Sequence, residues 1–313
     1  MGSSKKIFQI VNRFFRDCAK SVFETMSDFE EHPYWRAAHA DNISTLLPRI
    51  KKFNKAIRKF AGKPENVYFV QGCIDQHREF FITEFNRVES KDAADADVSE
   101  KQALKRRNVT KAIDDLFGNV LVTDSLRLRF DVDLAKKINE TIGKDLITDA
   151  GVYREFDAQP GCYGFTYLDP KKIKPCLKKL FEDIKEPIKP DRDDWYNVAT
   201  EFLNRFLFTH PFRNGNGRVA RILLSALLIH YSIVPLCFFL VARILLSALL
   251  IHYSIVPLCF FLWKCGSNGI YLYVLAEAHN PLTRNDKLLK SFIIEVVHST
   301  LEQCVKDLDL TIP

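Results

Sequence analysis

The sequence contains no C-x-x-C pair and no cluster of Cys and His at zinc-ligand spacing, although eight of its 313 residues are cysteines. These absences exclude the usual patterns of a structural zinc site and of a disulfide framework. The N-terminus also lacks the charged and then apolar pattern of a secretory signal peptide. We therefore expect reduced thiols and a cytoplasmic protein.

The sequence has no strong excess of one charge either. Its formal net charge is +6, and 27% charged residues accompany 47% hydrophobic residues, which is the balance of an ordinary globular protein. The densest basic stretch, Arg49 to Lys59, has the spacing of a solvated helix face. We therefore expect no nucleic acid among the partners of this protein.

Apolar residues recur at helical spacing through most of the chain, which predicts a mainly α protein. Asp131 has the position of a helix N-cap, and Gly143 has that of a stop signal. The polar run 90–102 separates a helical N-terminal region, 1–100, of unknown role from a second domain at 120–300. The helical patterns lie at 7–29, 43–60, 73–88, 131–142, 173–184 and 195–208.

Residues 150–170 differ in composition from the helical segments around them. They are rich in Tyr, Phe and Gly, with Pro at the turns, and this composition is typical of a hairpin or a loop. We predict one small β-hairpin here and no other β-structure in the chain.

The segment 219–240 is repeated letter for letter at 241–262. Structural repeats that stack diverge in sequence, so two identical adjacent copies favour an insertion into an older sequence. Pro235 and Pro257 interrupt helical hydrogen bonding within each copy, and we expect two short helices. Two long uncharged stretches within 222–263 leave an alternative open, in which a hairpin of spans associates the protein with a membrane.

A glycine-rich stretch, HPFRNGNGRVAR, occupies residues 210–221 between two predicted helices. The glycines let the backbone approach an anion closely, and the start of the following helix adds its positive dipole. An asparagine between the glycines and two arginines on one side of the helix supply further donors to phosphate oxygens. The predicted phosphate-binding residues are Gly215, Asn216, Gly217, Arg218 and Arg221.

His210 precedes this loop and has the position of a general base for an attacking hydroxyl. The alternative is ordinary packing at a helix end, which we expect of Phe212 as a core anchor. A base, an anion loop and two arginines in this order are difficult to explain by packing alone. The stretch therefore indicates phosphate chemistry.

The same stretch resembles the signature H-x-F-x-[D/E]-G-N-G-R-x-x-R of the Fic (Fic/Doc, Fido domain) family. AGVYRE at 150–155 is similar to the family's A-G-x-Y-R segment, and YLYVLAEAH at 271–279 is similar to the helix that follows the core. The resemblance covers residues 120–300. The residues that match the signature are His210, Phe212, Gly215, Asn216, Gly217, Arg218 and Arg221.

The resemblance implies an all-α bundle with a β-hairpin flap over the site. It also implies transfer of AMP from ATP to a Ser, Thr or Tyr hydroxyl of a target protein, with release of pyrophosphate. In that reaction His210 is the base, and the phosphate-binding residues hold the nucleotide. The flap, around Gly161 to Tyr167, would align the target as an added strand. The resemblance does not identify the target protein, and it leaves open whether this protein forms a homodimer.

Asn214 departs from the signature, which has Asp or Glu at this position to hold Mg²⁺. An amide oxygen lacks the negative charge that Mg²⁺ or Mn²⁺ favours, so we expect weakened metal binding at Asn214 and slower transfer. Two interpretations remain. One is an attenuated adenylyltransferase, and the other is a module that uses another phosphate-containing donor or only binds nucleotide or protein.

Many members of the family carry an inhibitory motif, [S/T]-x-x-x-E-[G/N], whose Glu pairs with the second arginine of the signature. The nearest match is Thr110 to Asp115, in which Asp114 replaces the Glu. A second match, Ser291 to Val296, has Glu295 but no final Gly or Asn. We expect both segments to be ordinary helix residues.

Overall fold

The structure, a computed structural model, describes part of the chain. The described residues are 28–35, 41–61, 63–66, 68, 82, 96–120, 130–159, 166–185, 194–231, 269–280 and 285–311. The predicted helices at 7–29 and 73–88 lie outside these residues except for positions 28, 29 and 82.

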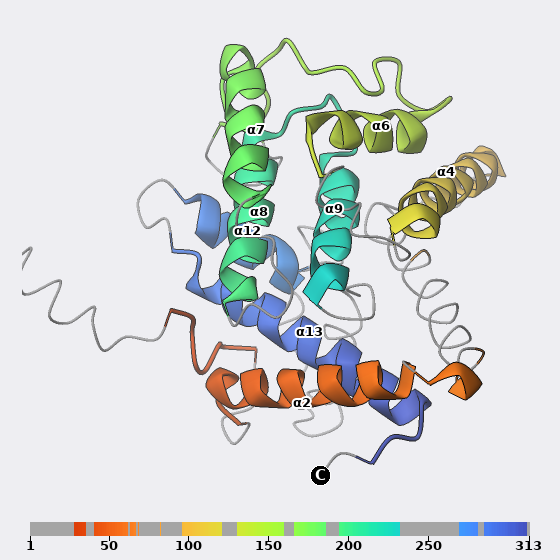
Figure 1. The fold of residues 1–313 in the computed structure, drawn as a ribbon. Coiled ribbons are helices and arrows are strands. Elements are labelled where there is room, and N and C mark those ends of the chain that lie inside the picture. Colours follow the sequence, from red (N-terminus) through yellow and green to blue (C-terminus); the bar gives the residue numbers. More distant parts are fainter. Residues whose placement is uncertain are drawn as a thin grey trace, which may run out of the picture.

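The regular elements of the described residues are helices, without a strand, and they form a bundle (Figure 1). The predicted mainly α fold is therefore confirmed, and the helical patterns predicted from residue 131 to residue 208 are found within a few positions of their expected bounds. The helices are α2 (Ile43–Ala61), α4 (Ala96–Val120), α6 (Val132–Gly143), α7 (Pro170–Lys185), α8 (Trp195–Thr209), α9 (Asn216–Tyr231), α12 (Gly269–His279) and α13 (Lys287–Asp307), with a 3-10 turn at Pro64–Asn66.

Helix α6 begins and ends where its local sequence predicts. The Asp131 carboxylate accepts the backbone N–H of Leu134 at 2.8 Å and so satisfies one donor of the first turn. At the other end, a Cβ on Gly143 would lie 2.7 Å from the Cβ of Ala150. The absence of a side chain at Gly143 therefore lets the AGVYRE segment pass close to the end of α6.

Helix α8 is the central element, since it packs against α7, α9, α12 and α13. Phe202 and Phe206 are fully buried along it. Phe202 lies 5.3 Å from Phe130 and 6.0 Å from Phe181, measured between ring centroids. Burial of these aromatic side chains stabilises the bundle, so α8 presents its C-terminal end, and the loop that follows, from a rigid support.

Helix α2 lies along α13 (Figure 1). Its apolar residues, such as Ile50 and Ile57, are buried. The basic residues of Arg49 to Lys59 that the structure describes are exposed, and Arg49 pairs with Asp41 at 2.6 Å. The predicted solvated helix face is therefore confirmed. Helix α2, from the N-terminal part of the chain, therefore shares a core with the C-terminal helix α13.

The second inhibitory candidate, Glu295, lies in that same interface. Glu295 is 5% exposed, and the indole N–H of Trp35 donates a hydrogen bond to its carboxylate. The hydroxyl of Ser291, one turn earlier, donates to the Glu30 carbonyl at 2.6 Å. These contacts give both side chains a role in attaching residues 28–35 to α13.

The predicted hairpin at 150–170 lies only partly within the described residues. Among its described residues, the β-pairing is one isolated bridge between Tyr153 and Phe212, and the expected tip at Gly161 to Phe165 lies outside the described residues. The backbone N–H of Tyr167 nevertheless donates to the Ala158 carbonyl at 3.0 Å, so the two ends of the flap are joined. The Arg154 side chain donates to the carbonyls of Phe156 and Leu168 in this segment.

The second copy of the duplication lies outside the described residues, as do Pro235 and Pro257. Helix α9 contains the start of the first copy. Among the described residues, no helix combines the length and the apolar character that crossing a membrane requires.

Candidate active site

The loop between α8 and α9 is closed by the side chain of Asn216. Its Oδ1 accepts the Phe212 N–H at 2.8 Å, and its Nδ2 donates to the Phe212 carbonyl at 2.7 Å. Both polar atoms of this side chain hold the turn, and the predicted donation to a phosphate would come from the second N–H of Nδ2. Phe212 itself is fully buried, which confirms the predicted core anchor.

Gly215 has the backbone conformation that the loop requires. Its φ is +82°, which L side chains rarely adopt, and an added Cβ would lie 3.1 Å from both Asn139 Nδ2 and Ile142 Cδ1. Asn139 is fully buried and donates to the Asn214 carbonyl at 2.9 Å, while its Oδ1 accepts the Gly151 N–H at 2.8 Å. One side chain of α6 therefore links the glycine loop to the AGVYRE segment.

Helix α9 begins directly after Gly215. Its first intrahelical hydrogen bond runs from the Val219 N–H to the Gly215 carbonyl at 2.9 Å. The N–H groups of Asn216, Gly217 and Arg218 precede that bond, and such first-turn donors, together with the helix dipole, form an anion-binding end. The structure thus produces the helix N-terminus that the sequence predicts after the glycine loop.

The two signature arginines both lie inside the bundle. Arg218 is 4% exposed and Arg221 is 2% exposed. A guanidinium nitrogen of Arg218 comes within 3.7 Å of the Cβ position on Gly215, whereas the Arg221 guanidinium lies 5.9 Å from the centroid of the Tyr271 ring. Arg218 therefore lies behind the glycine loop, and Arg221 lies one turn deeper against α12.

Arg154 of the AGVYRE segment holds the start of the loop. It is 4% exposed, and burial lowers the pKa of its guanidinium whereas Asp157 and Asp169 raise it. Its side chain joins both ends of the flap to the end of α8. The groups it contacts are the carbonyls of Phe156 at 2.6 Å, Thr209 at 3.3 Å, His210 at 2.7 Å and Leu168, and its backbone N–H donates to the Pro211 carbonyl at 2.9 Å.

His210 caps helix α8 and is half-buried. Its backbone is left-handed, with φ 45°, and its N–H donates to the Phe206 carbonyl at 3.1 Å. Burial is the largest of the causes that together bring the pKa of His210 down to about 4. The charges of Arg154 and His279 also lower this pKa, and a backbone hydrogen bond with Leu207 raises it. The imidazole is therefore neutral at pH 7. Because the Leu207 bond occupies one ring nitrogen, the other nitrogen can accept a proton.

This lowered pKa predicts a loss of stability in acid. Unfolded His210 takes up a proton below pH 6.5, but the folded state does so only near pH 4, so the unfolded state is favoured as the pH falls through this window. We expect the free energy of unfolding to fall by about 2 kcal/mol between pH 7 and pH 5 through this group. Urea unfolding at the two pH values measures this difference in the free energy of unfolding.

The control for this acid effect is the variant His210→Asn, which has no group that titrates in this range. Its stability should depend less on pH than that of the wild type. The remaining slope belongs to groups such as His279, whose pKa burial also lowers. Equal slopes for the wild type and the variant would show that His210 binds protons equally in both states.

Asn214 is exposed at the tip of the loop. Its Oδ1 accepts the N–H of Gly215 at 2.7 Å. The one signature position that would supply a metal ligand is therefore a neutral amide oxygen that is already hydrogen-bonded. Nor do the described residues contain a group of three or more His, Cys, Asp or Glu side chains that could hold a metal ion. A tightly held Mg²⁺ does not fit these residues.

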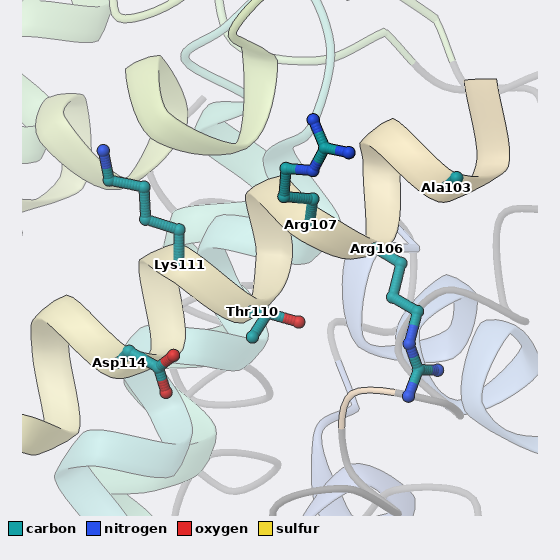
Figure 2. Close-up of a pocket in the computed structure, with 6 residues that line it drawn as sticks. All are labelled: Ala103, Arg106, Arg107, Thr110, Lys111 and Asp114. Carbon is teal, nitrogen blue, oxygen red and sulfur yellow. The ribbon is translucent and has the colours of Figure 1, made fainter. Parts of the chain in front are cut away.

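A cavity of about 450 Å³ lies on α4, and none of its described lining residues belongs to the glycine loop. The lining includes Arg106, Arg107 and Lys111. Figure 2 shows Arg107 and Lys111 extending away from Arg106, so these cations do not converge on one point. Thr110 and Asp114, the first inhibitory candidate, also line this cavity. Within the part of the chain that the structure describes, the loop before α9 is therefore the better candidate for anion binding.

The structure adds three residues to the predicted site. Arg154, Asn139 and Tyr167 contact the loop or His210, although none belongs to the signature. Arg154 lies in the AGVYRE segment, so its position was marked by resemblance without a role. Tyr167 was included only as the end of the predicted flap, and Asn139 was not singled out for the site, since each acts through a contact with a residue distant in the sequence.

Comparison with known proteins supports this description. Residues 129–228 match the family model described as the Fic/DOC family. A Fido domain-containing protein from Dictyostelium discoideum is 34% identical over 89 residues, which is 28% of this chain. The matched segment spans 61% of that relative's length.

Solved structures have the same fold. A Fic domain-containing signaling protein from Bacteroides thetaiotaomicron aligns with a TM-score of 0.58 at 16% identity, over 86% of this chain and 100% of that chain. A fragment of Fic-1 from C. elegans aligns with a TM-score of 0.52 at 12% identity, over 84% of this chain and 72% of that chain. The family match contains the whole glycine loop and most of the helices that frame it, so residues 129–228 are similar to the Fic/DOC family in sequence and in fold.

Proposed function

We propose that this protein is a protein adenylyltransferase, which transfers AMP from ATP to a Ser, Thr or Tyr hydroxyl of a target protein. The observation that carries the proposal is the arrangement around the loop. A neutral imidazole follows α8 directly, and the helix start that can bind phosphate lies a few residues further on. Phosphoryl and nucleotidyl transfer depend mainly on positioning and on electrostatic stabilisation, and both are built into this loop.

In the proposed reaction, His210 accepts the proton of the target hydroxyl. The hydroxyl oxygen then bonds to the α-phosphorus, the bond between that phosphorus and the bridging oxygen breaks, and pyrophosphate leaves. The first-turn N–H groups of Gly217 and Arg218 stabilise the negative charge on phosphate oxygens. A bound triphosphate raises the proton affinity of His210, because a nearby negative charge favours imidazolium. The proton on His210 then passes to solvent.

The position of the radiolabel tests this reaction class. The full chain is incubated with each of the common nucleoside triphosphates, labelled at the α-phosphate or at the γ-phosphate, and self-modification is measured. Label transferred from the α-phosphate of ATP supports adenylyl transfer. Label transferred from the γ-phosphate would contradict adenylyl transfer and indicate phosphoryl transfer. Absence of transfer from every nucleotide contradicts the enzymatic proposal.

A specific observation favours a second candidate, in which the domain binds nucleotide or a protein but transfers little. The Asn214 amide is neutral and hydrogen-bonded to the loop, so the signature position for a metal ligand lacks its charge. On this alternative the chain retains affinity for a nucleotide or for another phosphate-containing donor. Nucleotide binding without transfer, measured by calorimetry, would distinguish it from the enzyme.

The variant Asn214→Asp decides between attenuation and loss of function. We expect it to raise self-modification with Mg²⁺ or Mn²⁺ by about tenfold or more, which corresponds to roughly 1.4 kcal/mol of transition-state stabilisation. The added carboxylate supplies the charged oxygen that these cations favour. Asn214→Ala is the matched control and should give no gain. An Asp variant as slow as the wild type would favour the binding module.

A further inference from the structure

We infer that Tyr167 is a positioning residue for His210, so that the base of the flap orients the imidazole of the active site. This inference rests on the proposed function for its catalytic consequence. The contact itself is independent of any reaction. It joins a residue of the flap to the one residue of the signature that would accept a proton.

The rings of Tyr167 and His210 are stacked. Their centroids lie 3.9 Å apart, and the angle between the ring planes is 13°. At this separation the phenol covers one face of the imidazole in van der Waals contact and keeps water from that face. Rotation of the imidazole about its Cβ–Cγ bond would drive a ring edge into the phenol. The stack therefore restricts the directions in which the basic nitrogen can point.

The backbone around Tyr167 fixes the phenol in that place. The Tyr167 N–H donates to the Ala158 carbonyl at 3.0 Å, and the N–H of Leu168 donates to the Phe208 carbonyl at 3.2 Å. The carbonyl of Leu168 also accepts a hydrogen bond from Arg154. Tyr167 is thus attached to the other end of the flap and, through its neighbour, to the last turn of α8, which carries His210.

The charged and titratable groups that act on His210 come from the other elements around it. Arg154 of the AGVYRE segment and His279 of α12 both lower its pKa by their charge, and the Leu207 backbone in α8 holds one ring nitrogen. Tyr167 acts on His210 by covering and orienting the ring. Removal of the phenol should admit water to the imidazole and raise its pKa from about 4 toward the ordinary 6.5.

Two variants of the full chain test the inference. Tyr167→Phe keeps the stacked ring, and Tyr167→Leu removes it while the position stays apolar. The pKa of His210 is measured by NMR titration of the imidazole C–H signals, with His210→Asn used to assign the signal. For the Phe variant we expect the wild-type pKa and a kcat within about twofold. For the Leu variant we expect a pKa higher by about one unit, kcat lower by about tenfold, and an unchanged KM for ATP.

Phe208→Leu is the matched control. The Phe208 ring lies 5.7 Å from the His279 ring, so its removal takes away an aromatic neighbour of the other histidine. This variant should leave both the pKa of His210 and kcat at their wild-type values. A loss of kcat in Phe208→Leu equal to that in Tyr167→Leu would overturn the inference, because any aromatic substitution near α8 would then have the same effect.

The outcomes separate this inference from the proposed function. A Leu variant that folds and keeps both the wild-type pKa and the wild-type kcat overturns the role of Tyr167, as does a raised pKa with an unchanged kcat. If the wild type transfers no nucleotide, the proposed function fails, and the titration of the Phe and Leu variants still decides whether Tyr167 orients His210. If Tyr167→Leu lowers the melting temperature, Tyr167→Met replaces it in both measurements.

Discussion

Replacing His210 by alanine is expected to lower adenylyl transfer by about a hundredfold to ten-thousandfold, which is the range that removal of a general base produces. The variant His210→Ala has no group at this position that can accept the proton of the target hydroxyl. The loop that would bind the phosphates is built by Asn216, Gly215 and Asn139, so ATP affinity should change little. Transfer of label from the α-phosphate and calorimetric ATP binding measure the two effects separately.

The control for this prediction is the second buried histidine of the region. His279 is 8% exposed, and its Nε2 lies 3.1 Å from the Asn204 carbonyl. His279→Asn should change transfer by less than about threefold, because His279 acts on His210 only through its charge. If His210→Ala kept most of the activity, the imidazole could not be the base. Loss of transfer together with preserved binding of a partner would instead support the binding module.

Replacing Arg154 by methionine is expected to destabilise the protein by about 3 kcal/mol or more. The side chain donates to carbonyls of the flap and of the end of α8. Arg154→Met keeps a similar length but leaves these carbonyls without their donor, and each unsatisfied buried acceptor costs about 1–3 kcal/mol. Thermal unfolding followed by circular dichroism should show a midpoint lower by about 5 °C or more.

Arg205 provides the matched control for Arg154. Its side chain is 33% exposed and forms ion pairs with Asp183 at 2.8 Å and Glu201 at 2.7 Å. Such surface pairs contribute little, so Arg205→Met should cost less than about 1 kcal/mol. Equal losses for the two methionine variants would indicate that the carbonyls around Arg154 find water when the guanidinium is removed. Arg154 would then not be the residue that fixes the start of the loop.

Much of the fold could be predicted from local sequence. Asp131 caps α6, and the buried aromatic residues of α8 recur at helical spacing, because capping and amphipathic patterning act over one or two turns. The hairpin at 150–170 was predicted from composition and implied by the resemblance, and its described residues contain one isolated bridge. Composition indicates a tendency to form turns and extended segments. It does not show which donors will form hydrogen bonds with the backbone carbonyls of those segments.

The roles within the site were predicted unevenly. The glycine loop, its following helix and the buried anchor at Phe212 were all anticipated from the signature. The side chain of Asn216 was predicted to donate to a phosphate, and the structure adds a role that was not predicted, in which the side chain closes the loop on the Phe212 backbone. An asparagine can make either kind of hydrogen bond, and only the folded turn shows which partner lies within reach.

The sequence by itself determined the order of the parts: a helix end, a histidine, a loop that needs glycine at φ +82°, and a second helix start. These features depend on backbone preferences and hydrogen bonds between residues a few positions apart. Only the tertiary structure decided that Arg154 holds the loop and that Tyr167 covers the imidazole of His210. Both contacts join segments more than forty positions apart, and such pairings depend on how the whole bundle packs.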